Sequence, residues 1–516
     1  MAKMVDRVSG MRVAFAASIA FLTLGLVAYA WAQSPAPVRY DLVIEGGRVM
    51  DPETGVDRIA NVGVTGGTIR AISDAPLEGK RKINARGLVV APGFIDLHAH
   101  GQTPSDNDIQ ARDGVTTALE LESGVYPIAP FYTKREGHSR INFGASVSHR
   151  GLRVFVATGM ESTEMGVDPE LSARLLSAQD KWAYPRFDQS QVDRLRDLFR
   201  REFAAGGLGM GLAPEYIPGA GRDEVFAMFQ EVADLHAPVF VHVRRAETAM
   251  GDGPIAPMQE VIADAAATGA SLHIVHIGSK ALGAIAPILQ MIEGARAHGV
   301  DVTTEVYPYT ASSTRIGSAL FDEGWRGRQG AEYSDVEWPA TGERLTEESF
   351  NRFRRDSPEA FVVVHKISDL TVDTAIANPM VMIASDGVPF VDGAGHPRGA
   401  GTFARVLGYY VRERQLLSLM DGLRKMTLMP AQRLEQISPA MRKKGRLQVG
   451  ADADITIFDP ARVIDRATYA KPTTPSDGIP YVLVGGVVIV DRGQIVADVH
   501  PGKGIRSGGP NVEIAK

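Results

Sequence analysis

An apolar strand that ends in two histidines decides how this chain is organised: Pro92-Gly93-Phe94-Ile95-Asp96-Leu97-His98-Ala99-His100. Residues two apart on a β-strand point to the same face, so this strand would direct both imidazoles toward one point. Neutral imidazole is the commonest protein ligand for a metal ion. A histidine pair at a strand end also occurs without any ligand, so the metal interpretation depends on further donors elsewhere in the chain.

Residues 93–440 alternate strand-like and helix-like stretches, which is typical of βα units around a parallel sheet. Eight stretches are strand candidates: Gly93–Leu97, Thr116–Leu121, Asn142–Val147, Gly207–Leu212, Val239–Val243, Leu272–Ile277, Val302–Val306 and Met380–Ala384. Eight such units predict an α/β fold of the TIM-like (β/α)8 barrel type, whose active site lies at the carboxyl ends of the strands. An interruption at about 318–358 is predicted to be a lid over that site, with a surface insertion as the alternative.

Both ends of the chain differ from this middle part. Residues 33–92 and 441–516 contain short strands separated by glycine turns, and together they predict a small β-sandwich built from both chain ends. Residues 1–32 combine basic residues, an apolar run and a small-x-small motif, which predicts a signal peptide. The body is therefore expected to be periplasmic or secreted, with a membrane anchor as the alternative if the segment is not cleaved.

The composition excludes several classes of site. The chain has no cysteine, so disulfides, thiolate metal ligands and cysteine nucleophiles are excluded. A net charge of −6 and the lack of a long basic run give no indication of a nucleic-acid partner. The expected partner is a small molecule, and the sequence leaves the oligomeric state open.

Four of the predicted strands end in residues that bind metals. They are His98 and His100 on the first strand, His242 on the fifth, His276 on the sixth and Asp386 on the eighth. Because the carboxyl ends of these strands meet at one rim, they predict a metal site made of nitrogen and oxygen donors. Such donors suit Zn²⁺, with Mn²⁺, Co²⁺ or Fe²⁺ as alternatives. Five ligands exceed what one tetrahedral ion with an open position takes, which favours two ions over one.

Two ions that share a site need an anionic bridge. The second strand carries Glu120 and Glu122 on one face. Glu122 lies nearer the strand end and is the predicted bridge, with Glu120 as the alternative. Either carboxylate could instead serve as a salt-bridged neighbour of the ligands.

Together these motifs resemble the amidohydrolase superfamily and, within it, the N-acyl-D-amino-acid deacylase (D-aminoacylase) branch. The resemblance covers nearly the whole mature chain, and the string His396-Pro397-Arg398-Gly399-Ala400-Gly401-Thr402-Phe403-Ala404-Arg405-Val406-Leu407-Gly408 is its most branch-specific part. It implies a distorted TIM barrel with a β-sandwich, one or two zinc ions, and hydrolysis of the amide bond of an N-acyl amino acid. Carried over by position, His98, His100 and Asp386 would hold one ion, and His242 and His276 the other.

The chain departs from the branch pattern at two places. Ser123 stands where the branch has a metal-ligating cysteine, and Gly278 stands where it often has a lysine near the substrate. Residues 207–215 also lack the lysine with which other members of the superfamily bridge two ions. The alternatives are a cyclic-amide hydrolase of hydantoinase or dihydroorotase type, a dipeptidase, and a catalytically silent binding protein.

The resemblance and the site chemistry predict roles for further residues. Asp386 is expected to take a proton from a metal-activated water and to pass it to the leaving amine. Tyr309 or Tyr307 is expected to donate a hydrogen bond to the oxyanion, with simple packing as the alternative. Arg398 and Arg244 are expected to hold a substrate carboxylate or, as the alternative, to pair with a nearby acidic side chain. His149 and His396 receive no role.

Overall fold

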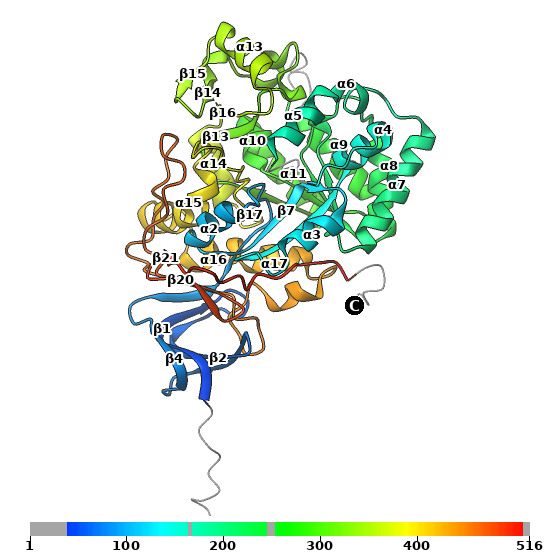
Figure 1. The fold of residues 1–516 in the computed structure, drawn as a ribbon. Helices are drawn as coiled ribbons and strands as arrows, with labels where there is room; N and C mark the ends of the chain where they lie inside the picture. Colours follow the sequence, from blue (N-terminus) through cyan, green and yellow to red (C-terminus); the bar gives the residue numbers. More distant parts are fainter. Residues whose placement is uncertain (1–38, 164–167, 245–252, 509–516) are drawn as a thin grey trace, which may run out of the picture.

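The computed structural model describes residues 39–163, 168–244 and 253–508. The predicted signal peptide, residues 1–32, lies outside the described residues. Within the described part of the chain, no helix is both long enough and apolar enough to cross a membrane. Figure 1 shows a central α/β barrel, a sheet from the chain ends at one end of it, and a small insertion at the opposite end.

The barrel is built from eight parallel strands. Its order along the sheet is β17 (Val381–Ile383), β12 (Val302–Val306), β11 (Ser271–Ile274), β10 (Pro238–Val241), β9 (Met210–Leu212), β8 (Asn142–Ser148), β7 (Val115–Val125) and β6 (Phe94–Asp96). A parallel bridge between Ala99 and Gly387 joins the ends of the two outermost strands. Each strand falls within or beside one of the eight predicted stretches, so the predicted barrel is confirmed.

Helices surround the barrel on its outside (Figure 1). Those of eight or more residues are α2 (Pro104–Arg112), α3 (Ile128–Arg135), α4 (His149–Thr158), α5 (Pro169–Ser177), α7 (Gln189–Ala204), α8 (Arg222–Asp234), α9 (Ile255–Thr268), α11 (Ile285–Ala297), α14 (Asp369–Ala377), α15 (Arg398–Arg405) and α16 (Leu419–Met426). The short ones are α6 (Gln179–Trp182), α10 (Ile277–Ala281) and α17 (Leu428–Leu434). Alternation along each strand sends one set of apolar side chains toward these helices and the other into the barrel, where Leu119, Phe240 and Met382 share one core.

The two chain ends form one nine-stranded sheet. Its strands are β1 (Arg39–Asp51), β2 (Val56–Thr65), β3 (Thr68–Ser73), β4 (Glu78–Asn84), β5 (Val89–Pro92), β18 (Ile455–Phe458), β19 (Tyr481–Val484), β20 (Val487–Asp491) and β21 (Gln494–Ile495). The antiparallel pair β5–β18 joins the N-terminal strands to the C-terminal ones. Apolar residues of both groups, such as Ile44, Val62 and Ile455, form a single core, so the predicted unit from both chain ends is confirmed.

The insertion between β12 and β17 has a sheet and a core of its own. The sheet contains β13 (Ala311–Arg315), β14 (Val336–Trp338), β15 (Glu343–Arg344) and β16 (Phe361–His365), and the helices are α12 (Trp325–Gln329) and α13 (Glu347–Asp356). The interruption predicted at about 318–358 lies inside this longer segment. Its core, with Trp325, Phe350 and Val362, is separate from the core of the barrel. Its predicted role as a lid stays a prediction.

Gly93 marks the junction between the sheet and the barrel. Its backbone N–H donates to the carbonyl of Asp454 on the sheet side, at 2.8 Å. A Cβ at position 93 would lie 2.2 Å from the Oγ1 atom of Thr116 on β7. Only glycine therefore lets the chain pass from β5 into β6 while both neighbouring strands stay in place.

We predict that Gly93→Ala lowers the free energy of unfolding by about 1–3 kcal/mol, since the added methyl group overpacks a closed site. Calorimetry should show this as a lower unfolding midpoint. The matched control is Gly283→Ala, because a Cβ at position 283 meets no atom within 4 Å and the residue is exposed. An equal midpoint for the two variants would contradict the prediction.

Candidate metal centre

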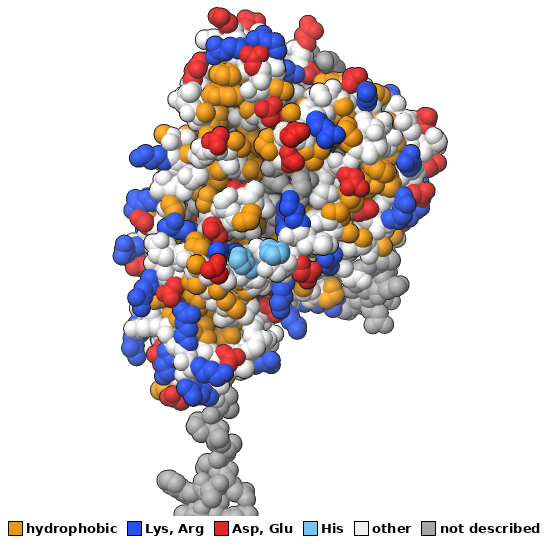
Figure 2. Space-filling model, viewed as in Figure 1, with side chains coloured by type: hydrophobic (Ala, Val, Ile, Leu, Met, Phe, Trp, Pro, Cys, Tyr) orange, Lys and Arg blue, Asp and Glu red, His pale blue; other side chains and the backbone are white. Residues whose placement is uncertain are grey.

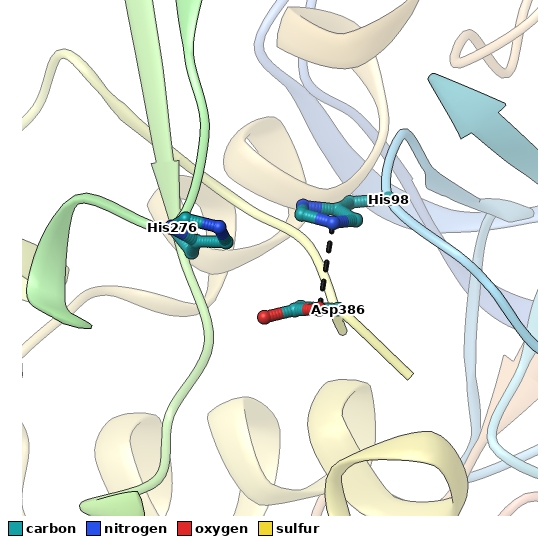
Figure 3. Close-up of side chains that lie close together, drawn as sticks. All are labelled: His98, His276 and Asp386. Atoms are coloured by element: carbon teal, nitrogen blue, oxygen red, sulfur yellow. Dashed lines mark ion pairs between the residues drawn. The ribbon is translucent and has the colours of Figure 1, made fainter. Parts of the chain in front are cut away.

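All six predicted metal ligands converge at the carboxyl ends of the barrel strands. Three overlapping groups have ligand atoms within 4.8 Å of one another: His98, His276 and Asp386; His98, His100 and Glu122; and Glu122, His242 and His276. Figure 3 shows His98, His276 and Asp386 arriving from three separate segments and pointing toward one another. His276 and Asp386 have positive φ angles of 36° and 50°, a conformation that costs of order 1–3 kcal/mol and is typical of functional sites.

Glu122 lies between two pairs of histidines. Its Oε1 atom is 2.6 Å from His242 Nδ1 and 3.3 Å from His276 Nε2. Its Oε2 atom is 3.3 Å from His100 Nε2 and 3.6 Å from His98 Nε2. One carboxylate thus presents one oxygen to each histidine pair, which is the arrangement expected of a group that bridges two cations.

Each of the four imidazoles is also held from outside the cluster. Its second nitrogen contacts an oxygen of another side chain: His98 Nδ1 with Glu305 at 2.6 Å, His100 Nδ1 with Glu120 at 2.8 Å, His242 Nε2 with Glu215 at 2.7 Å, and His276 Nδ1 with Ser279 at 3.2 Å. A carboxylate at one nitrogen keeps the proton there and leaves the other nitrogen free to bind a metal. Glu120, the alternative bridge, therefore lies behind His100 and does not lie between the histidine pairs.

The free nitrogens face one another inside the cluster. His98 Nε2 lies 3.1 Å from His100 Nε2, and His276 Nε2 lies 3.0 Å from His242 Nδ1. Two nitrogen lone pairs at this distance repel each other unless a proton or a metal ion lies close to both. The residues present therefore fit one or two divalent cations.

The charges around the cluster also favour cations. Five carboxylates surround the imidazoles: Glu120, Glu122, Glu215, Glu305 and Asp386. The cations that pair with these acids are Arg398 and Lys280. Burial alone would lower the pKa of His98, but Asp386 and Glu305 outweigh burial and raise that pKa to about 10. Burial lowers the pKa of His276, in the same cluster, to about 4, which keeps that imidazole neutral and able to bind a metal ion.

Arg398 fixes the orientation of Asp386. The Oδ1 atom of Asp386 is 3.4 Å from both His98 Nε2 and His100 Nε2, and its Oδ2 atom is 2.9 Å from Arg398 Nη1. Burial acts to raise the pKa of Asp386, but Arg398 and the histidines hold it below its usual range. Arg398 is fully buried, and its ion pair with Asp386 is the alternative role that the sequence predicted.

The two candidate tyrosines lie in different surroundings. The hydroxyl of Tyr309 is 3.4 Å from Asp465 Oδ2, and the Arg405 guanidinium lies over the Tyr309 ring, so the structure does not bring Tyr309 to the cluster. Tyr307 lies nearer, with its ring centre 4.5 Å from the Arg398 guanidinium. Burial raises the pKa of Tyr307 above its usual range, which keeps its hydroxyl protonated.

Three other polar residues from the sequence analysis contact partners outside the cluster. Arg244 pairs with Glu260 at 3.0 Å, as its alternative role predicts. His149 Nε2 is 2.8 Å from Glu224 on α8, and His396 Nε2 is 2.9 Å from the carbonyl of Ala311. None of the three is a candidate ligand in this arrangement.

Sequence reasoning missed the carboxylates that hold His98 and His242. Glu305 lies inside β12 and also contacts His273 Nε2 at 3.1 Å, so a buried acid in an apolar strand was the available signal. Glu215 lies in the turn Pro214–Tyr216, just after β9, and forms a buried ion pair with Lys280 on α10. No pattern in the sequence predicts the pairing of Lys280 with Glu215, because helix α10 brings the two residues together only in the folded chain.

A large pocket opens beside the cluster. His100, Glu122, His242, His276 and Asp386 form part of its lining, and the insertion supplies another wall that includes Phe321 and Trp325. The face of the molecule in Figure 2 shows acidic and basic side chains interspersed, without a continuous field of one sign. Polar and apolar side chains together line this pocket beside the predicted metal ligands.

Comparison with known proteins now places the chain. Models described as the amidohydrolase family match residues 172–490 and 89–253. The chain belongs to the amidohydrolase family. An N-acyl-D-glutamate deacylase from Alcaligenes xylosoxydans xylosoxydans is 30% identical over 496 residues, which cover 91% of this chain and 97% of the relative. A D-aminoacylase from the same organism is 28% identical over 512 residues, which cover 90% of this chain and 97% of that protein.

A solved structure of a relative also matches this chain. The crystal structure of an N-acyl-D-glutamate deacylase from Bordetella bronchiseptica, complexed with zinc and a phosphonate inhibitor, superposes with a TM-score of 0.74. It is 25% identical, and the match covers 91% of this chain and 100% of that one. The predicted membership of the amidohydrolase superfamily, and with it a hydrolase of amide bonds, is confirmed.

We predict that the outer carboxylates control the two halves of the centre separately. Glu215→Gln should lower the metal affinity of the His242 and His276 pair about 10–100-fold, since it removes the carboxylate that holds His242. Glu305→Gln should act in the same way on the half that contains His98. Competition with a chelator, followed by metal analysis, would measure both affinities.

The two variants serve as controls for each other. Each should leave the affinity of the other half within about threefold of the wild type, well below the 10–100-fold range of an outer-partner loss. If both variants weakened the same half, or neither weakened any, this assignment of Glu215 and Glu305 would be wrong.

Proposed function

We propose that this chain is a zinc-dependent deacylase that hydrolyses the amide bond of N-acyl-D-amino acids. The observation that carries the proposal is Glu122, whose two oxygens divide four imidazoles into two metal-binding pairs. The zinc and the D-configured substrate are inferred from the relatives described above. Imidazole and carboxylate donors without thiolates are compatible with Zn²⁺ and also with Mn²⁺, Co²⁺ and Fe²⁺.

A divalent ion in such a site acts as a Lewis acid toward the substrate carbonyl and lowers the pKa of water. His98, His100 and Asp386 would hold one ion, His242 and His276 the other, and Glu122 would contact both. In this arrangement, Asp386 is the proton carrier, because it borders the pocket and its Oδ1 atom faces the cluster. It accepts the proton of the attacking water and returns it to the nitrogen of the leaving amino acid.

Arg398 supports this proton transfer without touching the substrate. Its ion pair with Oδ2 leaves Oδ1 as the only oxygen of Asp386 that is directed at the cluster. The pairing also keeps the carboxylate ionised and therefore ready to act as a base. Tyr307, protonated and packed against Arg398, is better placed than Tyr309 to donate to a developing oxyanion.

A cyclic-amide hydrolase is the second candidate that the sequence raised. The described strand β9, which would carry a bridging lysine in that class, is Met210-Gly211-Leu212 and is followed by Ala213 and Pro214. The position between the histidine pairs is already taken by Glu122 from β7. The site chemistry therefore favours the deacylase.

We also propose that the protein works outside the cytoplasm. The support is the sequence of residues 1–32, with its basic start, apolar run and Ala30-Trp31-Ala32 motif. Sequencing the N-terminus of the exported protein tests this, because cleavage would leave a chain that begins near Gln33. A protein recovered from the cytoplasm with Met1 intact would contradict it.

The deacylase proposal is tested by metal content and by turnover of paired N-acetyl-D- and N-acetyl-L-amino acids. We expect stoichiometric metal, hydrolysis that prefers the D-isomers, and loss of turnover after the metal is removed with a chelator. Activity should return when Zn²⁺ is added back. A fully metal-loaded protein that hydrolyses no N-acyl amino acid would overturn the proposal.

Asp386→Asn is expected to lower kcat by about 10²–10⁴-fold, because an amide cannot carry the proton. Metal analysis of the same sample should still find bound metal, because all four histidines and Glu122 are unchanged. The matched control is Asp223→Asn, an exposed aspartate that pairs with Arg186 on the surface. Near-normal kcat in Asp386→Asn would remove Asp386 from the mechanism.

A further inference from the structure

The pocket beside the metal cluster contains acidic and basic side chains in different positions. Its acidic lining residues in the described part of the chain are Glu120, Glu122, Glu215 and Asp386, and each of them contacts a histidine of the cluster. The cationic lining residues include Arg150 on α4 and Arg315 at the end of β13. The acidic lining residues thus all lie at the metal cluster, whereas Arg150 and Arg315 carry positive charge at other parts of the lining.

Arg150 occupies an unusual place for an arginine. It is the second residue of α4, whose amino end carries the positive pole of the helix dipole. The first turn of α4 contains no acidic residue, and the structure gives Arg150 no ion pair or hydrogen bond with any residue it describes. By contrast, Arg153 on the same helix forms a buried ion pair with Glu224. A cation placed at a positive helix end is favourable only when an anion joins it.

Arg315 and Ser318 lie in one turn of the insertion. The backbone N–H of Ser318 donates to the carbonyl of Arg315 at 3.1 Å, which holds the two residues together. Ser318 is 5% exposed and lines the pocket, and its hydroxyl has no hydrogen-bond partner among the described residues. A buried hydroxyl without a partner costs free energy unless a ligand completes it.

Two observations place this turn near both Arg150 and the metal ligands. Arg150 and Arg315 line the same pocket, and burial and then the charge of Arg150 lower the pKa of Arg315 to about 10. Arg315 also donates from Nη1 to the carbonyl of Glu359. Thr314, next to Arg315, has its Oγ1 atom 3.0 Å from the hydroxyl of Tyr216. The Tyr216 ring lies 4.7 Å from the ring of His242. One tyrosine therefore separates the turn from the cluster.

From this placement we infer that Arg150, Arg315 and Ser318 form a subsite for a carboxylate of the substrate. The inference rests on the proposed function and names the part of the substrate that this region of the pocket binds, which is a carboxylate. An N-acyl amino acid offers two sources of a carboxylate: its α-carboxylate and the carboxylate of an acidic side chain. Both match the paired guanidinium groups and the hydroxyl donor.

Steady-state kinetics on the metal-loaded full chain tests the inference with two matched pairs of substrates. N-acetyl-D-glutamate against N-acetyl-D-glutamine probes a side-chain carboxylate. N-acetyl-D-methionine against its carboxamide probes the α-carboxylate. We expect the wild type to favour at least one carboxylate over its matched amide by about tenfold or more, the range of a charge-assisted hydrogen bond.

Arg150→Met should reduce that preference to within about threefold, mainly through a higher KM, since the lost group binds substrate and takes no part in proton transfer. Arg150→Lys should retain part of it, because the charge remains while the paired geometry is lost. The matched control is Arg194→Met on α7, an exposed arginine outside the pocket that should behave like the wild type. The substrate pair whose preference falls identifies the carboxylate that binds.

Unchanged preferences for both pairs in Arg150→Met, with wild-type metal content and unfolding midpoint, would overturn the inference. A wild type that hydrolyses none of the substrates would instead overturn the proposed function. In that case the subsite is tested by binding, with glutarate as the probe. Glutarate should raise the unfolding midpoint of the wild type and not that of Arg150→Met, and an equal shift in both would overturn the subsite.

Discussion

The contact of Glu122 with four imidazoles is the constraint on which the rest of the site depends. One carboxylate contacts His242 and His276 through one oxygen and His98 and His100 through the other. This works only if three strand ends, β7, β10 and β11, and the segment after β6 lie at fixed distances from one another. A closed parallel barrel provides that rigidity, because its strand ends are tied together by hydrogen bonds and packed from within.

Carboxylates on the outer side of the cluster hold the histidines in position. Glu305 reaches His98 from β12, and Glu215 reaches His242 from the segment after β9. Gln329 of the insertion donates to the second oxygen of Glu215 at 3.2 Å. The insertion is therefore connected to His242, a predicted metal ligand, through a single carboxylate, in addition to forming a wall of the pocket.

The sequence predicted the barrel, the sheet from both chain ends and the residues that converge, because these follow from periodicity and from the positions of strand ends. His98 and His100 illustrate this, since their spacing alone fixes a common face. The choice between Glu120 and Glu122 could not be made in this way, because both lie on that face and only the closed barrel shows which one reaches the centre. The pairing of Arg398 with Asp386 likewise became visible only from the distance between them in the folded chain. The pairing of Lys280 with Glu215 depends on the short helix α10, which the sequence pattern did not predict.

The antiparallel pairing of β13 with β16 has a consequence for how this protein can change over evolutionary time. Ala311 pairs with His365, so the insertion leaves the barrel and returns to it at adjacent points. Its apolar core is formed by residues of the insertion itself. A segment with such closely spaced ends costs little to lengthen, shorten or exchange. The pocket wall can therefore vary, and new substrate preferences can arise there, provided that the contact of Gln329 with Glu215 is kept.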